Sequence, residues 1–566
     1  MPCIRRLVKD SLDKFNLLKN GESFKFHVQR CKSLCTYILD KVPPYIRNDE
    51  QYLGGDVWSE RVQKAWKEIY RVMKEAETYL NHCSTQVMKC LILDSTGEAF
   101  ALHMHDFAWS LLCLDLAILC PIEEWNDKIG LTEFRKRISD SFAEMSDLHL
   151  NQIDFKFEDY CDLRMACNQA AANAWSAKRK YKIGVLQFME RKLLETIRNE
   201  RKTRPAIDES ATGIPAWLQI PAKDLTIKNI IGEGSFGKVY MGSWLGHKVA
   251  VKDIPVDARD LFEREIAVLS KLHSPFIVQL IGTSCIERRH CRIVMELVSS
   301  SLDKVLKNSG CRASLALPVA VDMMLQISRG MEYLHRQGIM HMDLKASNVL
   351  VEPSAIPEFR EQGYGRVKLC DFGMASLGLS SFRCEDPKGT CYWRAPEAFR
   401  FPDQELLQEI DTLKEYTYKA DVYSFAMTCY EILTGIQPFL GVHPKGLYRM
   451  IVQGKRPILL QPSCPAVLAD YIGKCWETDP GRRPCFAQVS TFMRNMKLCL
   501  LRWNDPRDWP AKSDGYFYPH DADVPLELVT SKEEAFDEIP ADEKLKSIAR
   551  AHRFPPEIKR YELLLI

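Results

Sequence analysis

The sequence lacks a large excess of charge of either sign, and it lacks a long hydrophobic run. Its 77 Lys and Arg residues are nearly balanced by 75 Asp and Glu residues, giving a formal net charge of +2. This balance argues against a general nucleic-acid-binding protein, although it allows local basic patches. The most apolar stretch, residues 107–120, is too short to span a bilayer and contains Asp115. We therefore expect a buried helix there and no transmembrane segment.

The chain also lacks targeting and metal-binding patterns. Its N-terminus has no apolar signal-peptide core, and Pro2 stands where myristoylation requires glycine. The 20 cysteines show no metal-ligand spacing. Without a secretory signal we interpret them as reduced thiols and predict a cytoplasmic protein.

What the chain has is length and an ordinary globular composition. Its 566 residues are 46% hydrophobic and 27% charged, which is typical of a folded protein too long for a single core. We expect two or three domains. Composition divides the chain into residues 1–200, a Pro-, Gly- and Ser-containing linker at 201–222, a third region at 223–500 and a tail at 501–566.

The N-terminal region is poor in Gly and Pro and shows helical periodicity. A first helix is predicted from apolar residues three or four apart, namely Phe24, Val28, Cys31, Cys35 and Ile38. We expect Pro43 and Pro44 to stop it. A second stripe comprises Val62, Trp66, Ile69, Met73, Ala76 and Leu80, with Lys64, Lys67, Glu68 and Lys74 around it. With helical stretches at 97–120, 131–149 and 160–200, the pattern predicts an all-α bundle.

A glycine-rich segment follows the apolar run 225–231. Its glycines let the backbone approach phosphate oxygens and offer N–H donors without side-chain clash. The segment leads into another strand-like run, 239–243, whereas a dinucleotide-binding loop would lead into a helix. We therefore predict a phosphate-binding hairpin. The candidate residues are Ile231, Gly232, Gly234, Ser235, Phe236, Gly237 and Val239.

The next strand carries Ala250 and Lys252, which share one face because side chains alternate along a strand. Ala250 can lie against adenine while Lys252 reaches the α- and β-phosphates. In the following helix, Glu265 shares a face with Leu269 and is the expected ion-pair partner of Lys252. The competing candidate, Glu263, lies about 200° away around the helix.

Four polar residues further on have separate tasks in phosphoryl transfer. Asp343 supplies a carboxylate that accepts the proton of a substrate hydroxyl. Lys345 stabilises charge on the transferring group. Asn348 and Asp371 offer hard oxygen ligands suited to Mg²⁺. The hairpin, Lys252, Glu265, the segment from Asp343 to Asn348, and Asp371 form five elements in one order along the chain.

On these motifs, residues 223–500 resemble a eukaryotic protein kinase domain. The resemblance extends to Ala395-Pro396-Glu397 and to Arg483, which in kinases pairs with the Glu of that motif. The segments 389–393 and 421–425 are similar to those of the tyrosine-kinase-like group, which includes Raf-like and mixed-lineage kinases. Lys345 is the residue typical of Ser/Thr kinases at its position.

The resemblance implies a bilobal α+β fold with a β-rich N-lobe and a helical C-lobe, together with ATP and Mg²⁺ as cofactors. It implies further nucleotide contacts from the gatekeeper Met295, from the hinge residues Glu296 and Val298, and from Leu350, which would face adenine with Val239 and Ala250. It also implies a regulatory spine made of Leu269, Leu280, His341 and Phe372.

The sequence departs from the kinase pattern at Met342, where most kinases have Arg. An Arg there would bind a phosphorylated activation loop, which Met cannot do. Such kinases resemble the non-Arg class, many of which are implicated in plant innate immunity. We hypothesise that activity does not require a phosphate in residues 374–394.

The N-terminal helices resemble those of a plant family of tyrosine-kinase-like kinases, whose domain is related to the bundles of mixed-lineage-kinase-domain-like proteins. This resemblance implies a bundle that binds regulatory protein partners or inhibits the kinase. Residues 178–204, with ten basic and three acidic residues, allow weak contact with an anionic membrane. A non-enzymatic nucleotide-binding switch is the alternative function. The enzyme is favoured because Lys252, Asp343 and Asp371 are all retained.

Overall fold

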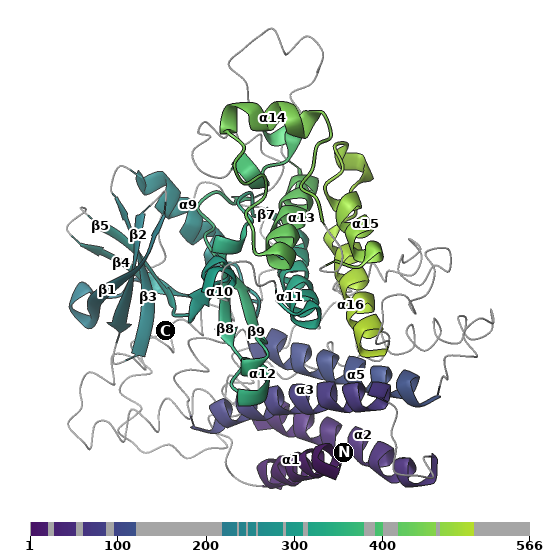
Figure 1. The fold of residues 1–566 in the computed structure, drawn as a ribbon. Coiled ribbons are helices and arrows are strands. Elements are labelled where there is room, and N and C mark those ends of the chain that lie inside the picture. The colour runs from purple at the N-terminus through teal and green to yellow at the C-terminus, as the bar shows by residue number, and fades with distance from the viewer. Residues whose placement is uncertain are drawn as a thin grey trace, which may run out of the picture. The chain divides into compact units, whose positions relative to one another are not determined.

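The computed structural model describes residues 2–20, 28–52, 60–85, 96–119, 218–234, 237–244, 247–255, 258–286, 290–308, 315–377, 391–399, 417–459 and 464–502. Within these ranges the chain has the predicted fold class: helices first, then a sheet-rich lobe and a helical lobe (Figure 1). The predicted helices at 131–149 and 160–200, the basic segment 178–204 and the tail from residue 503 lie outside them.

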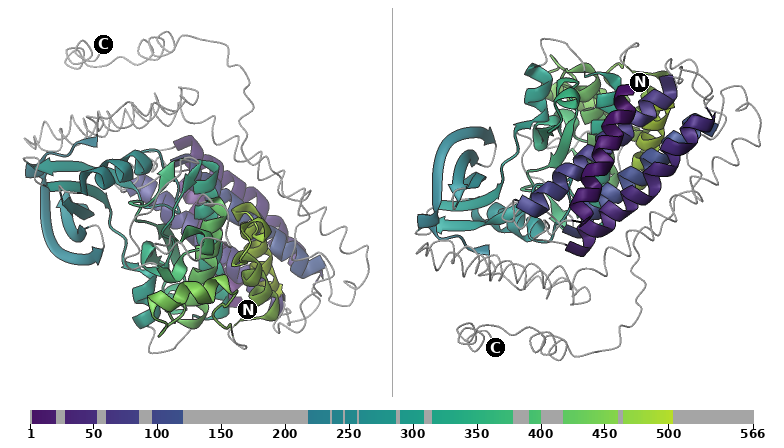
Figure 2. Two further views of the ribbon diagram at one scale, coloured as in Figure 1. Left: turned by 90° about the horizontal axis from the view of Figure 1, so that it is seen from above. Right: turned by 90° about the horizontal axis from the view of Figure 1, so that it is seen from below.

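The described N-terminal helices are α1 (Pro2–Asn20), α2 (Val28–Tyr52), α3 (Glu60–Thr85) and α5 (Thr96–Leu119). They lie alongside one another (Figure 2). Residues of both predicted stripes share one buried core, among them Cys31, Cys35, Ile38, Trp66, Ile69, Met73 and Leu80. The all-α prediction is confirmed for the described residues of this region, and so is the helix expected at about 97–120.

One boundary prediction is wrong, because α2 does not stop at Pro43 and Pro44 but continues to Tyr52. A proline inside a helix removes a backbone hydrogen bond and clashes with the preceding turn. Here Val42 and Ile46, on either side of the pair, are both buried in the bundle core. The hydroxyl of Tyr45 also donates to Asp115 of α5 at 2.9 Å. Tertiary contacts therefore hold the turn that the prolines weaken.

The N-lobe is a five-stranded antiparallel sheet in the order β1-β2-β3-β5-β4, covered by helix α9 (Arg259–Leu269). Its strands are β1 (Leu225–Gly234), β2 (Gly237–Trp244), β3 (His247–Pro255), β4 (Leu280–Ile286) and β5 (His290–Glu296). The expected hairpin is present, because β1 pairs directly with β2. Leu269 and Phe262 of α9 are buried in the main core, which fixes the helix on the lobe.

The C-lobe is mainly helical. Its helices are α10 (Leu302–Asn308), α11 (Leu317–Arg336), α12 (Pro357–Glu361), α13 (Tyr418–Thr434), α14 (Pro444–Val452), α15 (Ala466–Cys475) and α16 (Phe486–Arg502). Its short strands are β6 (Ser300–Ser301), β7 (Ile339–Met340), β8 (Val349–Pro353), β9 (Gly365–Leu369) and β10 (Ser376–Leu377). Turns of 3₁₀-helix occur at Ala222–Asp224, Ala346–Asn348, Cys391–Trp393, Pro396–Ala398 and Pro480–Arg482.

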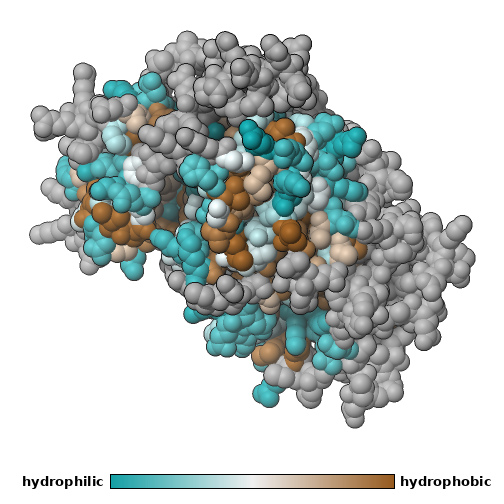
Figure 3. All heavy atoms as spheres, turned by 45° about the horizontal axis from the view of Figure 1, so that its top comes forward, coloured by the Kyte–Doolittle hydropathy of each residue, from teal (hydrophilic) through white to brown (hydrophobic). Residues whose placement is uncertain are grey.

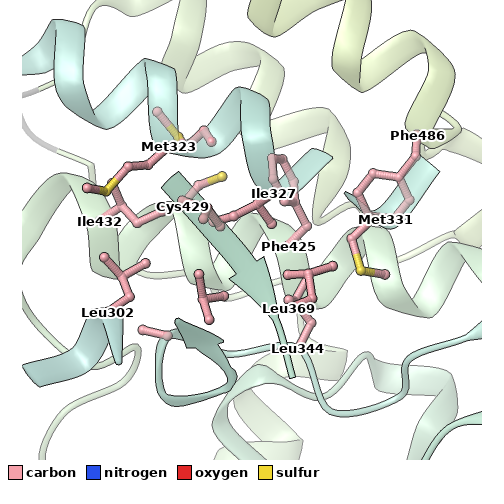
Figure 4. Close-up of a cluster of buried hydrophobic side chains, with 14 of the residues drawn as sticks. Leu302, Met323, Ile327, Met331, Leu344, Leu369, Phe425, Cys429, Ile432 and Phe486 are labelled. Carbon is pink, nitrogen blue, oxygen red and sulfur yellow. The ribbon is translucent and has the colours of Figure 1, made fainter. Parts of the chain in front are cut away.

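The C-lobe core reaches from its helices to the polar loops. Met323, Ile327 and Met331 repeat at fours along α11, and they pack with residues of α13 and α16 (Figure 4). Leu344, which lies between two polar residues of the predicted catalytic segment, belongs to the same cluster, as does Leu369 of β9. The core therefore anchors the backbone on which the candidate catalytic side chains stand.

The described surface is mixed in character. Hydrophilic and hydrophobic residues alternate over the face drawn in Figure 3. Among the described residues, the large apolar side chains exposed to solvent are Leu17, Ile230, Leu440 and Ile458, and exposed apolar residues that occur singly are normal. None of the described helices combines the length and the hydropathy needed to cross a membrane.

Candidate active site

The β1–β2 hairpin brings its glycines together as the sequence predicted. Gly232 pairs with Val239 and Gly234 with Gly237. Gly237 has φ +149°, and a Cβ there would lie 2.2 Å from the carbonyl oxygen of Asp253, so no larger residue fits. Ser235 and Phe236, also predicted to bind ATP, lie outside the described residues.

Strand register places the predicted adenine-facing residues on one side of the sheet. Val239 is opposite Lys252, and Ala250 is opposite Met295. Opposite residues and alternate residues share a face. Lys252, Ala250, Val239 and Met295 therefore line the same surface. Leu350 of β8 is half-buried against the core.

Glu296 differs from its neighbours in the predicted nucleotide site. Its carboxylate accepts a hydrogen bond from the backbone N–H of Gln279 at 2.8 Å and pairs with Lys368 of β9 at 2.7 Å. The buried Glu296 side chain thus connects the end of β5 with the residue before β4 and with β9. The backbone N–H of Glu296 also donates to the carbonyl oxygen of Gln279 at 3.0 Å, and Val298 is half-buried. Contact of either residue with a nucleotide stays a prediction.

Lys252 lies at the centre of a buried ion cluster. Its ammonium donates to both carboxylate oxygens of Glu265, at 2.9 and 2.7 Å, and to Asp371 at 2.7 Å. Glu265 is 1% exposed and Lys252 6% exposed. Glu263, the competing candidate, instead pairs with Arg259 on the outer side of α9. Of the two acidic residues considered, Glu265 is thus the one that contacts Lys252.

The cluster contains one cation and two carboxylates, and its pKa values reflect this. Burial acts to lower the pKa of Lys252, but Asp371 and Glu265 outweigh burial and raise it. Burial acts to raise the pKa of Asp371, but Lys252 outweighs it and holds that pKa below its usual value. Both groups are therefore charged near neutral pH.

The segment after β7 is held through its backbone by Asp421, at the start of α13. The Asp421 carboxylate accepts from the N–H groups of His341 and Met342, each at 2.9 Å, and lies 2.9 Å from His335 Nε2. Met342 has a positive φ of 66°, which is uncommon for a non-glycine residue. Asp421 thus fixes a strained turn immediately before Asp343.

Asp343, Lys345 and Asn348 contact one another. Lys345 Nζ donates to Asp343 Oδ2 at 2.8 Å. Asn348 Nδ2 donates to the carbonyl oxygen of Asp343 at 2.7 Å and to its Oδ2 at 2.8 Å. These bonds orient the Asp343 carboxylate. Because the amide nitrogen of Asn348 is used in them, its amide oxygen is the atom that can bind a metal ion.

Cys370, which follows β9 and precedes Asp371, bonds through its backbone to Asn348 and His341. Cys370 N donates to the carbonyl oxygen of Asn348 at 3.0 Å, and the carbonyl oxygen of Cys370 lies 3.2 Å from His341 Nε2. Phe372 packs against the His341 ring with centroids 5.1 Å apart. Leu269 and Leu280, the other residues of the expected spine, are also buried.

The residues present fit a bound magnesium ion. Asn348 and Asp371 supply hard oxygen ligands, and the excess carboxylate beside Lys252 favours a cation. Among the described residues, no group of three or more His, Cys, Asp or Glu could hold a metal alone. Mg²⁺ usually takes one or two protein carboxylates together with phosphates and water.

A second carboxylate ties the catalytic segment to the Cys391–Trp393 turn. Glu431 of α13 accepts from Trp393 Nε1 at 2.7 Å and from the N–H of Ala346 at 3.2 Å. Burial raises the pKa of Glu431 to about 7.

The predicted ion pair of Arg483 and Glu397 is also present, with two hydrogen bonds of 2.6 and 2.9 Å.

The structure thus brings together the predicted polar residues that it describes, and it adds two that the sequence reasoning missed. In the sequence, Asp421 is marked only by its place in the family motif 421–425, and no motif marks Glu431. The available signal was a carboxylate inside an otherwise apolar helix, because both residues lie in α13 among buried neighbours. Such a charge must find donors within the fold.

Comparison with known proteins gives a consistent result. The family model described as protein tyrosine and serine/threonine kinase matches residues 225–493. A light-sensor protein kinase of Ceratodon purpureus is 35% identical over 298 residues, which is 50% of this chain and 22% of that protein. The serine/threonine/tyrosine-protein kinase HT1 of Arabidopsis thaliana is 32% identical over 286 residues, which is 49% of this chain and 67% of HT1.

The serine/threonine-protein kinase CTR1 of Arabidopsis thaliana is 32% identical over 287 residues, which is 49% of this chain and 32% of CTR1. The match therefore covers about a fifth of the light-sensor kinase, a third of CTR1 and two thirds of HT1.

Proposed function

Because the chain belongs to the protein tyrosine and serine/threonine kinase family, we propose that it transfers the γ-phosphate of ATP to Ser and Thr hydroxyls of proteins. One observation carries the proposal. Lys252, Glu265 and Asp371 form a single ion cluster, while Asp343, Lys345 and Asn348 form the adjoining hydrogen-bonded group. A nucleotide-binding switch needs the first group but has no use for the second.

Each group has a defined task in the reaction. The hairpin glycines and Lys252 bind and orient the phosphates. Asp343 accepts the proton as the hydroxyl oxygen attacks the γ-phosphorus, and the bond to the β-phosphate oxygen breaks. Lys345 stabilises the negative charge on the transferred group. Asn348 and Asp371 would hold Mg²⁺, which when bound neutralises charge on the β- and γ-phosphates.

The test is an autophosphorylation assay with radiolabelled ATP on the full chain. We expect Asp343→Asn to lower the rate about a thousandfold, since the substrate hydroxyl loses its base. Asp260→Asn, on the exposed side of α9, is the matched control and should behave as wild type. If wild type and Asp343→Asn both gave only background signal, the enzyme proposal would fail and the nucleotide-binding switch would take its place.

We propose Ser/Thr specificity on the basis of Lys345, the residue typical of Ser/Thr kinases. The name of HT1 includes tyrosine as well, so transfer to Tyr is the second candidate. A peptide array with matched Ser, Thr and Tyr acceptors separates the two. We expect signal on Ser and Thr, and a comparable rate on Tyr would establish dual specificity.

We further propose that the N-terminal bundle binds regulatory proteins, and that contact with anionic membranes is at most weak. Liposomes containing anionic lipid, incubated with the full chain, test the second point by co-sedimentation. Strong binding that leaves the liposomes leaky would favour a membrane-acting switch. The cytoplasmic location and the loop-independent activity expected from Met342 also remain predictions.

A further inference from the structure

Charged side chains that the proposed mechanism does not use lie buried where helices α3 and α5 meet the C-lobe. Four of them, Glu68 and Arg71 from α3, Asp322 from α11 and Lys497 from α16, are here called the junction cluster. Each is less than 9% exposed. The described parts of the bundle and of both lobes belong to one compact unit. The cluster borders a cavity of about 60 Å³, which is far below the volume of a typical ligand site.

The members of the junction cluster neutralise one another. Lys497 Nζ lies 2.7 Å from Asp322 Oδ1 within the lobe and 2.7 Å from Glu68 Oε1 across the junction. Arg71 binds Glu68 at 2.6 Å and approaches Asp322 at 3.9 Å. Burial acts to raise the pKa of Glu68, but Arg71 and Lys497 outweigh it and lower the pKa to about 2. Arg71 also binds Glu75 of α3 at 2.6 Å, whose side chain is 25% exposed, so each carboxylate in contact with the junction cluster has a cationic partner.

A second ion pair crosses the junction from α5. Arg329 of α11 donates to Asp106 Oδ1 at 2.8 Å, and its other terminal nitrogen lies 3.0 Å from His105 Nδ1. Burial acts to raise the pKa of Asp106, but Arg329 outweighs it and holds that pKa well below its usual range. The Asp106 carboxylate is therefore ionised near neutral pH.

Apolar contacts accompany these ion pairs. Trp109, Leu112 and Cys113 of α5 belong to the hydrophobic core of the kinase lobes, whereas Phe107, Leu111 and Leu114 of the same helix belong to the bundle core. Helix α5 thus buries two faces against two different partners, as expected of a helix that is apolar on all sides. Separating the bundle from the lobe would expose Trp109, which is now 7% exposed.

The junction cluster and the Arg329–Asp106 pair are both connected by further contacts to β9, the strand that ends two residues before Asp371. Asp322 accepts from Gln326 Nε2 at 2.9 Å, and the Gln326 amide in turn binds the carbonyl oxygen of Gly365 at 3.0 Å and the N–H of Val367 at 2.9 Å. The Arg329 guanidinium lies over the ring of Phe276 at 5.3 Å, and the carbonyl oxygen of Phe276 accepts from Leu369 N at 2.7 Å.

We propose that the α3–α5 face of the bundle is an activating partner of the C-lobe, which holds β9, and through it Asp371, in position for metal binding. The ion pairs fix Asp322 and Arg329 on α11. Asp322 in turn binds Gln326 and Arg329 packs on Phe276, the two residues that hydrogen-bond to β9. The catalytic part of this proposal rests on the proposed kinase activity. The docking part does not, and it is tested separately.

The experiment reverses the simpler pair in the full chain, using Asp106→Arg, Arg329→Asp and the double variant. Each single reversal sets like charges against each other, and the double variant restores an opposite pair. We expect faster amide hydrogen exchange in α5 and β9 for the single variants. We also expect a kcat about tenfold lower and a weaker apparent affinity for Mg²⁺ in autophosphorylation, with both properties largely restored in the double variant.

The control is Glu60→Arg, the same charge reversal at a position of α3 whose side chain is 62% exposed, and it should change nothing. Asp106→Asn serves if a reversal prevents folding, with the same but smaller changes expected. Unchanged exchange in β9 in the single variants, or no rescue in the double variant, would overturn the proposal. A rise in kcat would do so too, since it would identify an inhibitory contact. An inactive wild type with the expected exchange pattern would remove the kinase activity but leave the docking.

Discussion

The active site and the bundle junction each contain a buried charge cluster, and the two differ in balance. At the junction, Arg71 and Lys497 pair with Glu68 and Asp322, and Arg71 also binds the partly exposed Glu75. The site cluster has Lys252 against two carboxylates, Glu265 and Asp371. A buried excess of negative charge is costly unless a cation relieves it. The site cluster, with one lysine for two carboxylates, therefore points to a cationic ligand. The junction, where cations from both sides hold the carboxylates, points to a permanent protein contact.

Removing the lysine from each cluster should give the largest difference between the two clusters, in how magnesium affects stability. Lys252→Met leaves Glu265 beside Asp371, and Lys497→Met leaves Arg71 between Glu68 and Asp322. We expect each to lower the free energy of unfolding by about 3 kcal/mol. Added MgCl₂ should recover stability only in Lys252→Met, because the side chain of Asp371 is 29% exposed and can bind the ion.

Urea unfolding with and without MgCl₂ measures this difference, and initial rates give the effect on activity. Lys252→Met should lose at least about a hundredfold in kcat, since an electrostatic contact with the phosphates is gone. Lys497→Met should lose much less. If magnesium stabilised both variants equally, the distinction between the clusters would not hold.

Glu431 offers a smaller, pH-dependent test of the rule that burying a charge without an opposite partner costs stability. Its pKa in the folded protein is about 7, against an ordinary value of 4.5. Between these values the folded state binds a proton that the unfolded state has released. The contribution of Glu431 to stability is therefore fully present below pH 4.5 and is lost as pH rises through 7.

We expect wild type to lose about 2.5 kcal/mol of stability relative to Glu431→Gln between pH 5 and pH 8. Gln keeps an acceptor for Trp393 and Ala346 but cannot ionise. Urea unfolding at the two pH values measures the change. Parallel behaviour of the two proteins would mean that Glu431 is charged throughout.

The smallest effect is expected in the activation loop. Replacing Ser376, Ser380, Ser381 and Thr390 together by Ala should leave kcat close to wild type, because Met342 offers no charge that a loop phosphate could bind. The rate on a peptide substrate, measured after phosphatase treatment, checks this. Loss of activity in a variant with an unchanged circular dichroism spectrum would show that a loop phosphate is needed after all.

The two regions also differ in how far the sequence could predict them. The polar residues of the site were predictable because each motif combines a local pattern with a specific chemistry, as for Lys252 on a strand and Asp343 beside Lys345. Glu265 over Glu263 followed from helix geometry alone. The site roles themselves stay predictions until the variants are measured.

The junction could not be predicted in this way. Glu68 was placed among the polar residues around the α3 stripe, yet it is buried against Lys497, more than 400 positions further along the chain. A charged helix position has the same local pattern whether water or a distant lysine covers it. The continuation of α2 through Pro43 and Pro44 has a similar cause, because contacts with other helices outweighed a local signal.

The turn held by Asp421 has a consequence for protein engineering. The Asp421 carboxylate accepts hydrogen bonds from the backbone N–H groups of His341 and Met342. Every residue except proline has such a group, so these hydrogen bonds do not depend on the side chain at position 342. A probe side chain introduced there would report from a point next to the proton acceptor. With φ at 66°, glycine would relieve backbone strain at this position, and β-branched residues are the ones to avoid.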